Sequence, residues 1–132
     1  MNDLDKMVFI ARKCRRILEK ELKDNYPSDL AGACGLASYF LMREAERAGL
    51  YANYISGYFK GCNHSWVEFE DRIIDLTATQ FGILKETYVV KKNNRKYQKE
   101  FQTSDVEEAY EAIRSWSFVP PKLYEERIYI NV

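Results

Sequence analysis

The sequence predicts an α+β domain in which a central helix packs on a small antiparallel sheet. Three observations support this prediction. Apolar residues recur at intervals of three and four in two N-terminal segments, as in helices, and the interval changes to two after residue 49, as in strands. The 132 residues are enough for one buried core but not for two, so residues 1–132 are expected to form a single domain.

The first helix is expected over residues 3–24. Seven apolar side chains follow helical spacing along one face of it: Leu4, Met7, Val8, Ala11, Cys14, Leu18 and Leu22. Cys14 lies on this face, where a cysteine most simply packs as a small hydrophobic residue. Residues 25–33 then interrupt the helix, because Pro27 disfavours helical geometry before it and Gly32 permits unusual backbone angles.

A second helix is expected over residues 33–48, with Gly49 directly after its last turn. Its first half is apolar on almost every side, which is typical of a helix at the centre of a domain. Cys34 stands in the first turn of this helix, flanked by small residues that include Gly32 and Gly35. The helix dipole is positive at this end, and a positive environment favours the thiolate form of a cysteine.

Four strands are expected next, separated by turns at residues 61–63 and 70–71; the strands cover residues 51–60, 64–69, 72–77 and 86–91. The basic, polar segment that follows, residues 91–100, is expected to be a loop. Ser104 and Glu107 form a capping box that opens a third helix. The apolar face of this helix carries Val106, Ala109, Tyr110, Ile113 and Trp116. Residues 126–132 are expected to form a last strand.

Charge and cysteine content narrow the class of protein. Twenty Lys and Arg residues balance twenty Asp and Glu residues, so the net charge does not favour nucleic acid or an anionic membrane. No apolar run approaches the roughly 18 residues of a membrane span, and the acidic N-terminus does not fit a signal peptide. Three dispersed cysteines do not form a disulfide framework. Free thiols and a cytoplasmic location are therefore expected.

His64 is the only histidine, and Asp75 interrupts an apolar strand. A two-residue turn at 70–71 places Thr77 opposite His64 and puts Asp75 one diagonal step away on the same face. A buried carboxylate is costly without a partner, and the imidazole would supply one. A thiol such as Cys34 needs a histidine to take its proton, and that histidine needs a group to fix its tautomer. These three residues are therefore the candidate site.

A helix that begins at Cys34, followed by HSWVEFEDRIIDLTATQF at residues 64–81, resembles the transglutaminase-like branch of the papain-like cysteine enzymes. The segment HSWVE is close to the H-x-W-x-E form of many members, and the likeness covers about residues 32–81. The resemblance implies a papain-like or transglutaminase-like core, in which the Cys faces a His and an Asp on two successive antiparallel strands. It assigns Cys34 as nucleophile, His64 as general base and acid, and Asp75 as the orienting residue.

Two features depart from the pattern of this family. The intervals between the three site residues are short for the superfamily, which indicates a minimal core. The glutamine that commonly precedes the cysteine and completes the oxyanion hole is absent from residues 25–32. The alternatives for the oxyanion or substrate contact are Gln80, Tyr26, Ser28 and Asn25. Trp66 lies on the same strand face as His64 and is either a core aromatic residue or a wall of the active site.

The expected function is that of a thiol hydrolase, a cysteine protease or deamidase-like enzyme that attacks an amide bond and passes through a thioester acyl-enzyme. It needs no metal or organic cofactor, and its expected partner is a peptide or protein substrate, not a membrane or a nucleic acid. Transglutaminase-type acyl transfer is one alternative, since the triad does not choose between water and an amine. A non-catalytic binding module on the same fold is another.

Two further hypotheses have weaker support. The run Cys62, Asn63 and His64 contains metal-ligand types, but one histidine without a paired set of cysteines does not make a structural zinc site. The basic segment at residues 91–99 has the composition of a phosphate contact. Because the chain carries no net positive charge, a solvated loop is expected there instead.

Overall fold

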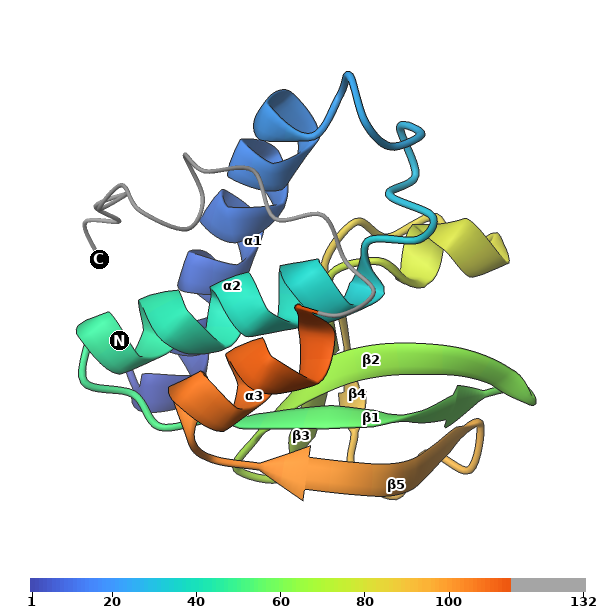
Figure 1. Cartoon of the computed structure of the whole chain (residues 1–132). Coiled ribbons are helices and arrows are strands. Elements are labelled where there is room, and N and C mark those ends of the chain that lie inside the picture. Colours follow the sequence, from blue (N-terminus) through green and yellow to red (C-terminus); the bar gives the residue numbers. More distant parts are fainter. Residues whose placement is uncertain (115–132) are drawn as a thin grey trace.

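Helices α2 and α3 lie on one face of an antiparallel sheet in the computed structural model, which describes residues 1–114 (Figure 1). The helices of this part of the chain are α1 (Asp3–Glu21), α2 (Cys34–Arg47) and α3 (Val106–Ile113), with a short 3-10 helix, η1 (Ala78–Phe81). Its strands are β1 (Asn53–Phe59), β2 (Cys62–Phe69), β3 (Arg72–Asp75), β4 (Tyr88–Lys91) and β5 (Tyr97–Thr103). They form one sheet in the order β4-β3-β2-β1-β5, with every neighbouring pair antiparallel. The predicted α+β class is confirmed.

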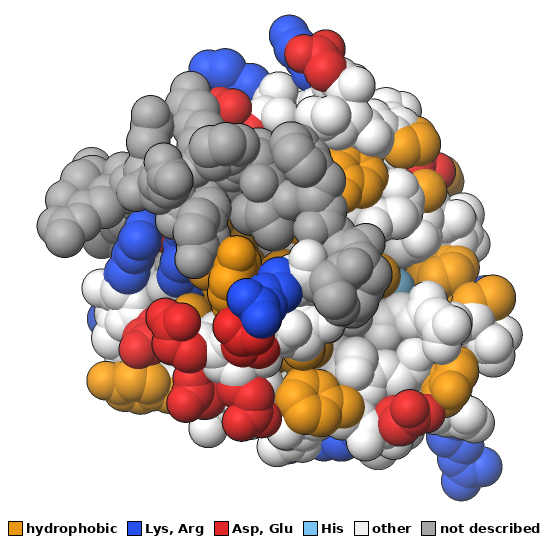
Figure 2. Space-filling model, in the orientation of Figure 1, with side chains coloured by type: hydrophobic (Ala, Val, Ile, Leu, Met, Phe, Trp, Pro, Cys, Tyr) orange, Lys and Arg blue, Asp and Glu red, His pale blue; other side chains and the backbone are white. Residues whose placement is uncertain are grey.

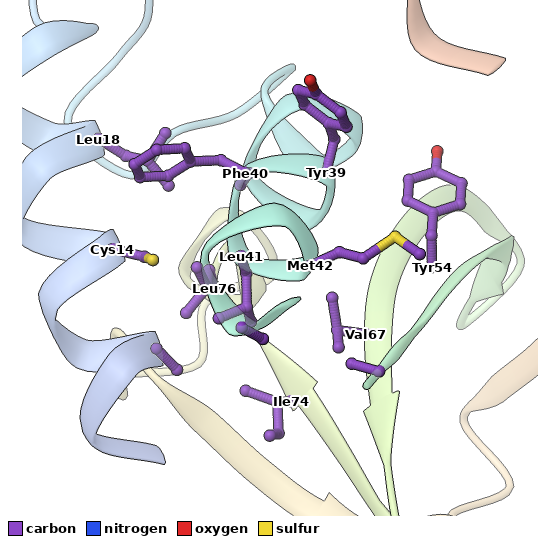
Figure 3. Close-up of a cluster of buried hydrophobic side chains, with 14 of the residues drawn as sticks. Cys14, Leu18, Tyr39, Phe40, Leu41, Met42, Tyr54, Val67, Ile74 and Leu76 are labelled. Atoms are coloured by element: carbon purple, nitrogen blue, oxygen red, sulfur yellow. The ribbon is translucent and has the colours of Figure 1, made fainter. Parts of the chain in front are cut away.

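The main core lies between α1, α2 and the sheet. Residues 35–45 of α2 are all buried, which confirms the prediction of a central helix. Figure 3 shows Cys14 and Leu18 of α1 pointing toward α2, and Val67 and Ile74 of the sheet packed beneath it. Burial raises the pKa of the Cys14 thiol, so Cys14 is a packing residue, as predicted.

A smaller core lies on the opposite face of the sheet, because successive strand residues point to opposite faces. Its buried members are Ile55, Phe59, Trp66, Ile73 and Tyr97, with Phe81, Ile83, Tyr88 and Val90 packed against them. The connection between β3 and β4, which includes η1, therefore covers this face. The alternation places His64 on the same face as Trp66, so the imidazole lies on the side of the smaller core.

The prediction of a loop over residues 91–100 was wrong, because β5 begins at Tyr97 and pairs with β1. Charged residues occupy the exposed positions of this strand and hide its alternation, although Tyr97 itself is buried. The turn predicted at residues 61–63 was too long. Lys60 and Gly61, both with positive φ, form a two-residue hairpin turn, and β2 already begins at Cys62.

The predicted third helix is confirmed as α3, but its cap is not the Ser104–Glu107 box. The carboxylate of Asp105 accepts hydrogen bonds from the backbone N–H groups of Glu107 and Glu108 at 2.8 and 3.2 Å. Trp116 and the strand predicted at residues 126–132 lie outside the described residues. No helix in the described part of the chain combines the length and the apolar character that a membrane span requires.

Candidate active site

Cys34 is the first residue of α2 and is half-buried. The helix begins without a side-chain cap at Ala33 and without an acidic residue in its first turn. By contrast, the side chains of Asn2 and Asp105 cap α1 and α3. The first backbone N–H groups of α2 are thus left for an anion near the sulfur, where the helix dipole is positive.

The imidazole of His64, on β2, contacts the carboxylate of Asp75, at the end of β3. Nε2 of His64 lies 2.7 Å from Oδ2 of Asp75. The strands pair with Phe69 opposite Arg72, which is the register that the two-residue turn predicts. The side chain of His64 is almost completely buried, with 3% of the residue exposed, and Asp75 is fully buried at 0%. The structure therefore brings these two candidate residues together in a site shielded from water.

From residues 1–114, Asp75 receives three hydrogen bonds. The Tyr97 hydroxyl donates to Oδ2 at 2.7 Å, the Thr77 backbone N–H donates to Oδ1 at 2.9 Å, and His64 supplies the third contact. Burial and the nearby charge of Asp75 raise the pKa of Tyr97, so its hydroxyl remains a donor. These hydrogen bonds satisfy the buried carboxylate of Asp75 and fix its plane, and the fixed carboxylate in turn orients the imidazole. Sequence analysis did not identify Tyr97 as part of the site.

Opposing effects set the protonation of His64. Burial alone would lower the pKa of His64, but the hydrogen bonds and negative charges of Asp75 and Cys34 outweigh it and raise this pKa to about 9. The ring is therefore an imidazolium near neutral pH. With Nε2 held by Asp75, Nδ1 is the nitrogen left for the cleft. An imidazolium stabilises negative charge on a neighbouring sulfur.

A cleft of about 450 Å³ opens beside the sulfur and the imidazole. The described residues that line it are Gly32, Cys34, Ser56, Gly57, Tyr58, Asn63, His64, Ser65, Gln80 and Glu100. Gly57 lies directly opposite His64 in the pairing of β1 with β2, next to a bulge in the pairing with β5. A Cβ at Gly57 would lie only 2.0 Å from the backbone oxygen of Gln98, so a glycine is required for this close approach.

The four oxyanion alternatives have different positions. Gln80 of η1 lines the cleft, and its Nε2 lies 3.4 Å from Nδ1 of His64 and 3.1 Å from Oγ1 of Thr77. Tyr26 and Ser28 line a separate cavity of about 510 Å³, and Asn25 is exposed. The structure does not bring them to the cleft, because the loop is anchored through the Ser28 carbonyl to the guanidinium of Arg15 at 3.3 Å.

Trp66 is a core residue behind the histidine, and it does not line the cleft. Its ring centroid lies 6.1 Å from that of His64 and 4.9 Å from that of Tyr97. Phe81 meets the imidazole edge-on from another side, with ring centroids 4.8 Å apart. These aromatic side chains exclude water from the imidazole and restrict its rotation.

Two lysines of the basic segment contact the buried carboxylate of Glu68. Nζ of Lys99 lies 2.8 Å and Nζ of Lys92 lies 3.6 Å from its Oε1. These cations therefore have a structural partner in the sheet.

Figure 2 shows acidic side chains gathered over α3, where Asp105 and Glu107 lie. Within residues 1–114, no group of three or more His, Cys, Asp or Glu side chains is placed to hold a metal ion.

Comparisons of the chain with protein-family models, with curated proteins and with solved structures found no match. The chemistry of the site is therefore argued from its own geometry.

Replacement of Tyr97 by phenylalanine is expected to lower the free energy of unfolding by about 2 kcal/mol, because Asp75 loses a buried charge-assisted hydrogen bond. Urea unfolding measures this loss. Tyr88→Phe is the matched control, since Tyr88 packs in the same small core and its hydroxyl is not one of the donors to Asp75. Equal losses in the two variants would contradict a specific role for the Tyr97 hydroxyl.

Proposed function

We propose that this protein is a thiol hydrolase that cleaves an amide bond of a peptide or protein through Cys34, His64 and Asp75. The observation that carries the proposal is one chain of contacts at one cleft. The sulfur at an uncapped helix start shares a cleft with an imidazole, and one nitrogen of this imidazole is held by a buried carboxylate. Each group has the neighbour that its role requires.

The reaction begins with attack of the Cys34 thiolate on the amide carbonyl. The oxyanion of the tetrahedral intermediate would accept hydrogen bonds from the first N–H groups of α2 and from the side-chain amide of Gln80. The His64 imidazolium then gives its Nδ1 proton to the leaving amine, which leaves a thioester on the sulfur. The neutral imidazole next takes a proton from water, and the resulting hydroxide attacks the thioester. This step releases the acid and restores the thiolate.

The same contacts support a transglutaminase-like core as the finer description of the fold. Cys34 begins the central helix, and His64 and Asp75 lie on β2 and β3, which are successive antiparallel strands. Hydrolysis is ranked above acyl transfer because water needs no binding surface of its own, and a domain of this size offers little surface for a second substrate. Cys14, Cys34 and Cys62 are free thiols, and we place the reaction in the cytoplasm, where thiols stay reduced.

A panel of peptide vinyl sulfones tests the proposal, with the adduct located by mass spectrometry. Labelling is expected at Cys34, it should be lost in His64→Gln, and it should be unchanged in Cys62→Ser. Hydrolysis of a labelled substrate in ¹⁸O-water should place ¹⁸O in the product acid, whereas an added primary amine should be taken up only if acyl transfer competes. Labelling at the rate of free cysteine, without an acyl product, would indicate the binding module instead.

A further inference from the structure

The cleft beside Cys34 contains a carboxylate that the proposed reaction does not use. Glu100 of β5 and Tyr58 of β1 both line this cleft. A hydrogen bond to the carboxylate of Glu100 and the negative charge of that group raise the pKa of the Tyr58 hydroxyl. Tyr58 is half-buried and Glu100 is exposed, so the pair is open to solvent and to a bound molecule.

Among residues 1–114, no neighbouring cation neutralises this carboxylate. None of the described residues that line the cleft is a lysine or an arginine. Lys99, the preceding residue on β5, pairs with Glu68 at 2.8 Å and therefore has another partner. Within residues 1–114, no basic side chain lies within salt-bridge distance of Glu100. The imidazolium of His64 already pairs with the buried carboxylate of Asp75, so it does not neutralise Glu100.

The pairing of the strands gives the distance between Glu100 and His64. Gly57 of β1 separates β2 from β5 at this point, since it pairs with His64 on one side and with Lys99 on the other. Neighbouring strands are about 4.8 Å apart, so the backbones at Glu100 and His64 are roughly 10 Å apart. Both residues line the same cleft. A basic side chain of a substrate spans such a distance.

We propose that Glu100 and Tyr58 form a subsite for a cationic side chain, and that the substrate is a peptide with lysine or arginine next to the bond that Cys34 attacks. A carboxylate forms charge-assisted hydrogen bonds with ammonium and guanidinium groups, and a tyrosine ring attracts the same cations. This inference rests on the proposed function for the bond that is attacked. The charge preference of the cleft can be measured without any turnover.

Charged methanethiosulfonates test the charge preference on the thiol of Cys34. The reagents are the trimethylammonium-ethyl form, which is cationic, and the sulfonatoethyl form, which is anionic. Each transfers its thioalkyl group to the thiolate and releases methanesulfinate. Rates at Cys34 are followed by mass spectrometry in a Cys62→Ser background, at low salt and near neutral pH. The ratio of cationic to anionic rates is expected to fall about fivefold in Glu100→Gln, and the fall should shrink at high salt.

Glu70→Gln is the matched control, because it removes the same charge from the exposed turn at the other end of β2. Its rate ratio should equal that of the parent protein. The inference is overturned if Glu100→Gln leaves the ratio unchanged, if both variants change it equally, or if neither reagent reaches Cys34. A different result would contradict the proposed function, namely a reactivity of Cys34 that does not change when His64 is replaced. The ratio of cationic to anionic rates could still be measured in that case.

Discussion

Replacing His64 is expected to slow the alkylation of Cys34 by iodoacetamide near neutral pH by roughly 20-fold. Only a few per cent of an ordinary thiol is ionised at this pH, and the thiolate is the reactive form. In the proposed site, the imidazolium of His64 stabilises negative charge on the sulfur. Without this cation, the rate should instead rise with pH as it does for a free thiol.

Two substitutions of His64 differ in their effect on folding, and this difference separates a loss of thiol reactivity from a loss of folding. His64→Ala leaves the buried carboxylate of Asp75 without its partner, which destabilises the fold. His64→Gln keeps an amide that can donate to Asp75 while it removes the titrating cation. Cys62, which is exposed, serves as an internal control because its alkylation should be equal in all proteins. Equal alkylation of Cys34 in wild type and in His64→Gln would contradict the ion pair.

Replacing Arg15 by methionine is expected to lower the free energy of unfolding by about 4 kcal/mol. Arg15 of α1 is buried, with 3% exposed. Its guanidinium donates to the backbone carbonyls of Leu76 and Ser28 and, at 3.0 Å, to Oγ1 of Thr79. Methionine fills a similar volume but leaves these acceptors without a donor, at about 1–3 kcal/mol for each group that stays buried.

The same substitution should also disturb the site. Arg15 joins the loop that leads into Cys34 to the segment that follows Asp75, and Thr79 reinforces the link through a 2.9 Å hydrogen bond to the Asp29 carbonyl. Arg12→Met is the control, because Arg12 is an exposed residue one turn earlier on α1. Urea unfolding should show a change of less than about 0.5 kcal/mol for this control. A similar small change in Arg15→Met would contradict its role as the clamp between the two segments.

The parts of the fold that were predictable depend on local pattern. The apolar faces of α1 and α2 repeat over several turns, so both helices were identified with small errors at their ends. The contact of His64 with Asp75 was also predictable, because one short hairpin sets its register. Whether His64 and Asp75 lie on the same face of this hairpin depends only on the number of residues between them, so no knowledge of the remaining fold was required.

The parts that were missed depend on pairing between distant segments. Tyr97 reaches Asp75 only because β5 pairs with β1, and the charged residues around Tyr97 concealed that strand. Gln80 was one of four alternatives, and the folding of the connection after β3 decides between them. The subsite at Glu100 depends on a bulge beside Gly57, which no local pattern specifies.

The titration of the only histidine tests the central claim most directly, since its imidazole proton signals can be followed by NMR without assignment against other histidines. The raised pKa of His64, about 9, lies above the value of about 6.5 in an unfolded chain. The interaction of the His64 imidazolium with its negative partners therefore contributes its full stabilisation of the fold below about pH 6.5. This contribution is lost as the pH rises toward about 9.

The Cys34→Ala and Asp75→Asn variants complete this measurement. Each variant removes a negative partner of the imidazole, so the apparent pKa of His64 should fall in both. Because these groups interact, each apparent pKa describes the coupled groups together and not His64 alone. The account predicts a wild-type titration near pH 9 that moves down in each variant. A wild-type titration near the ordinary value of about 6.5, unmoved by the loss of Cys34, would contradict it.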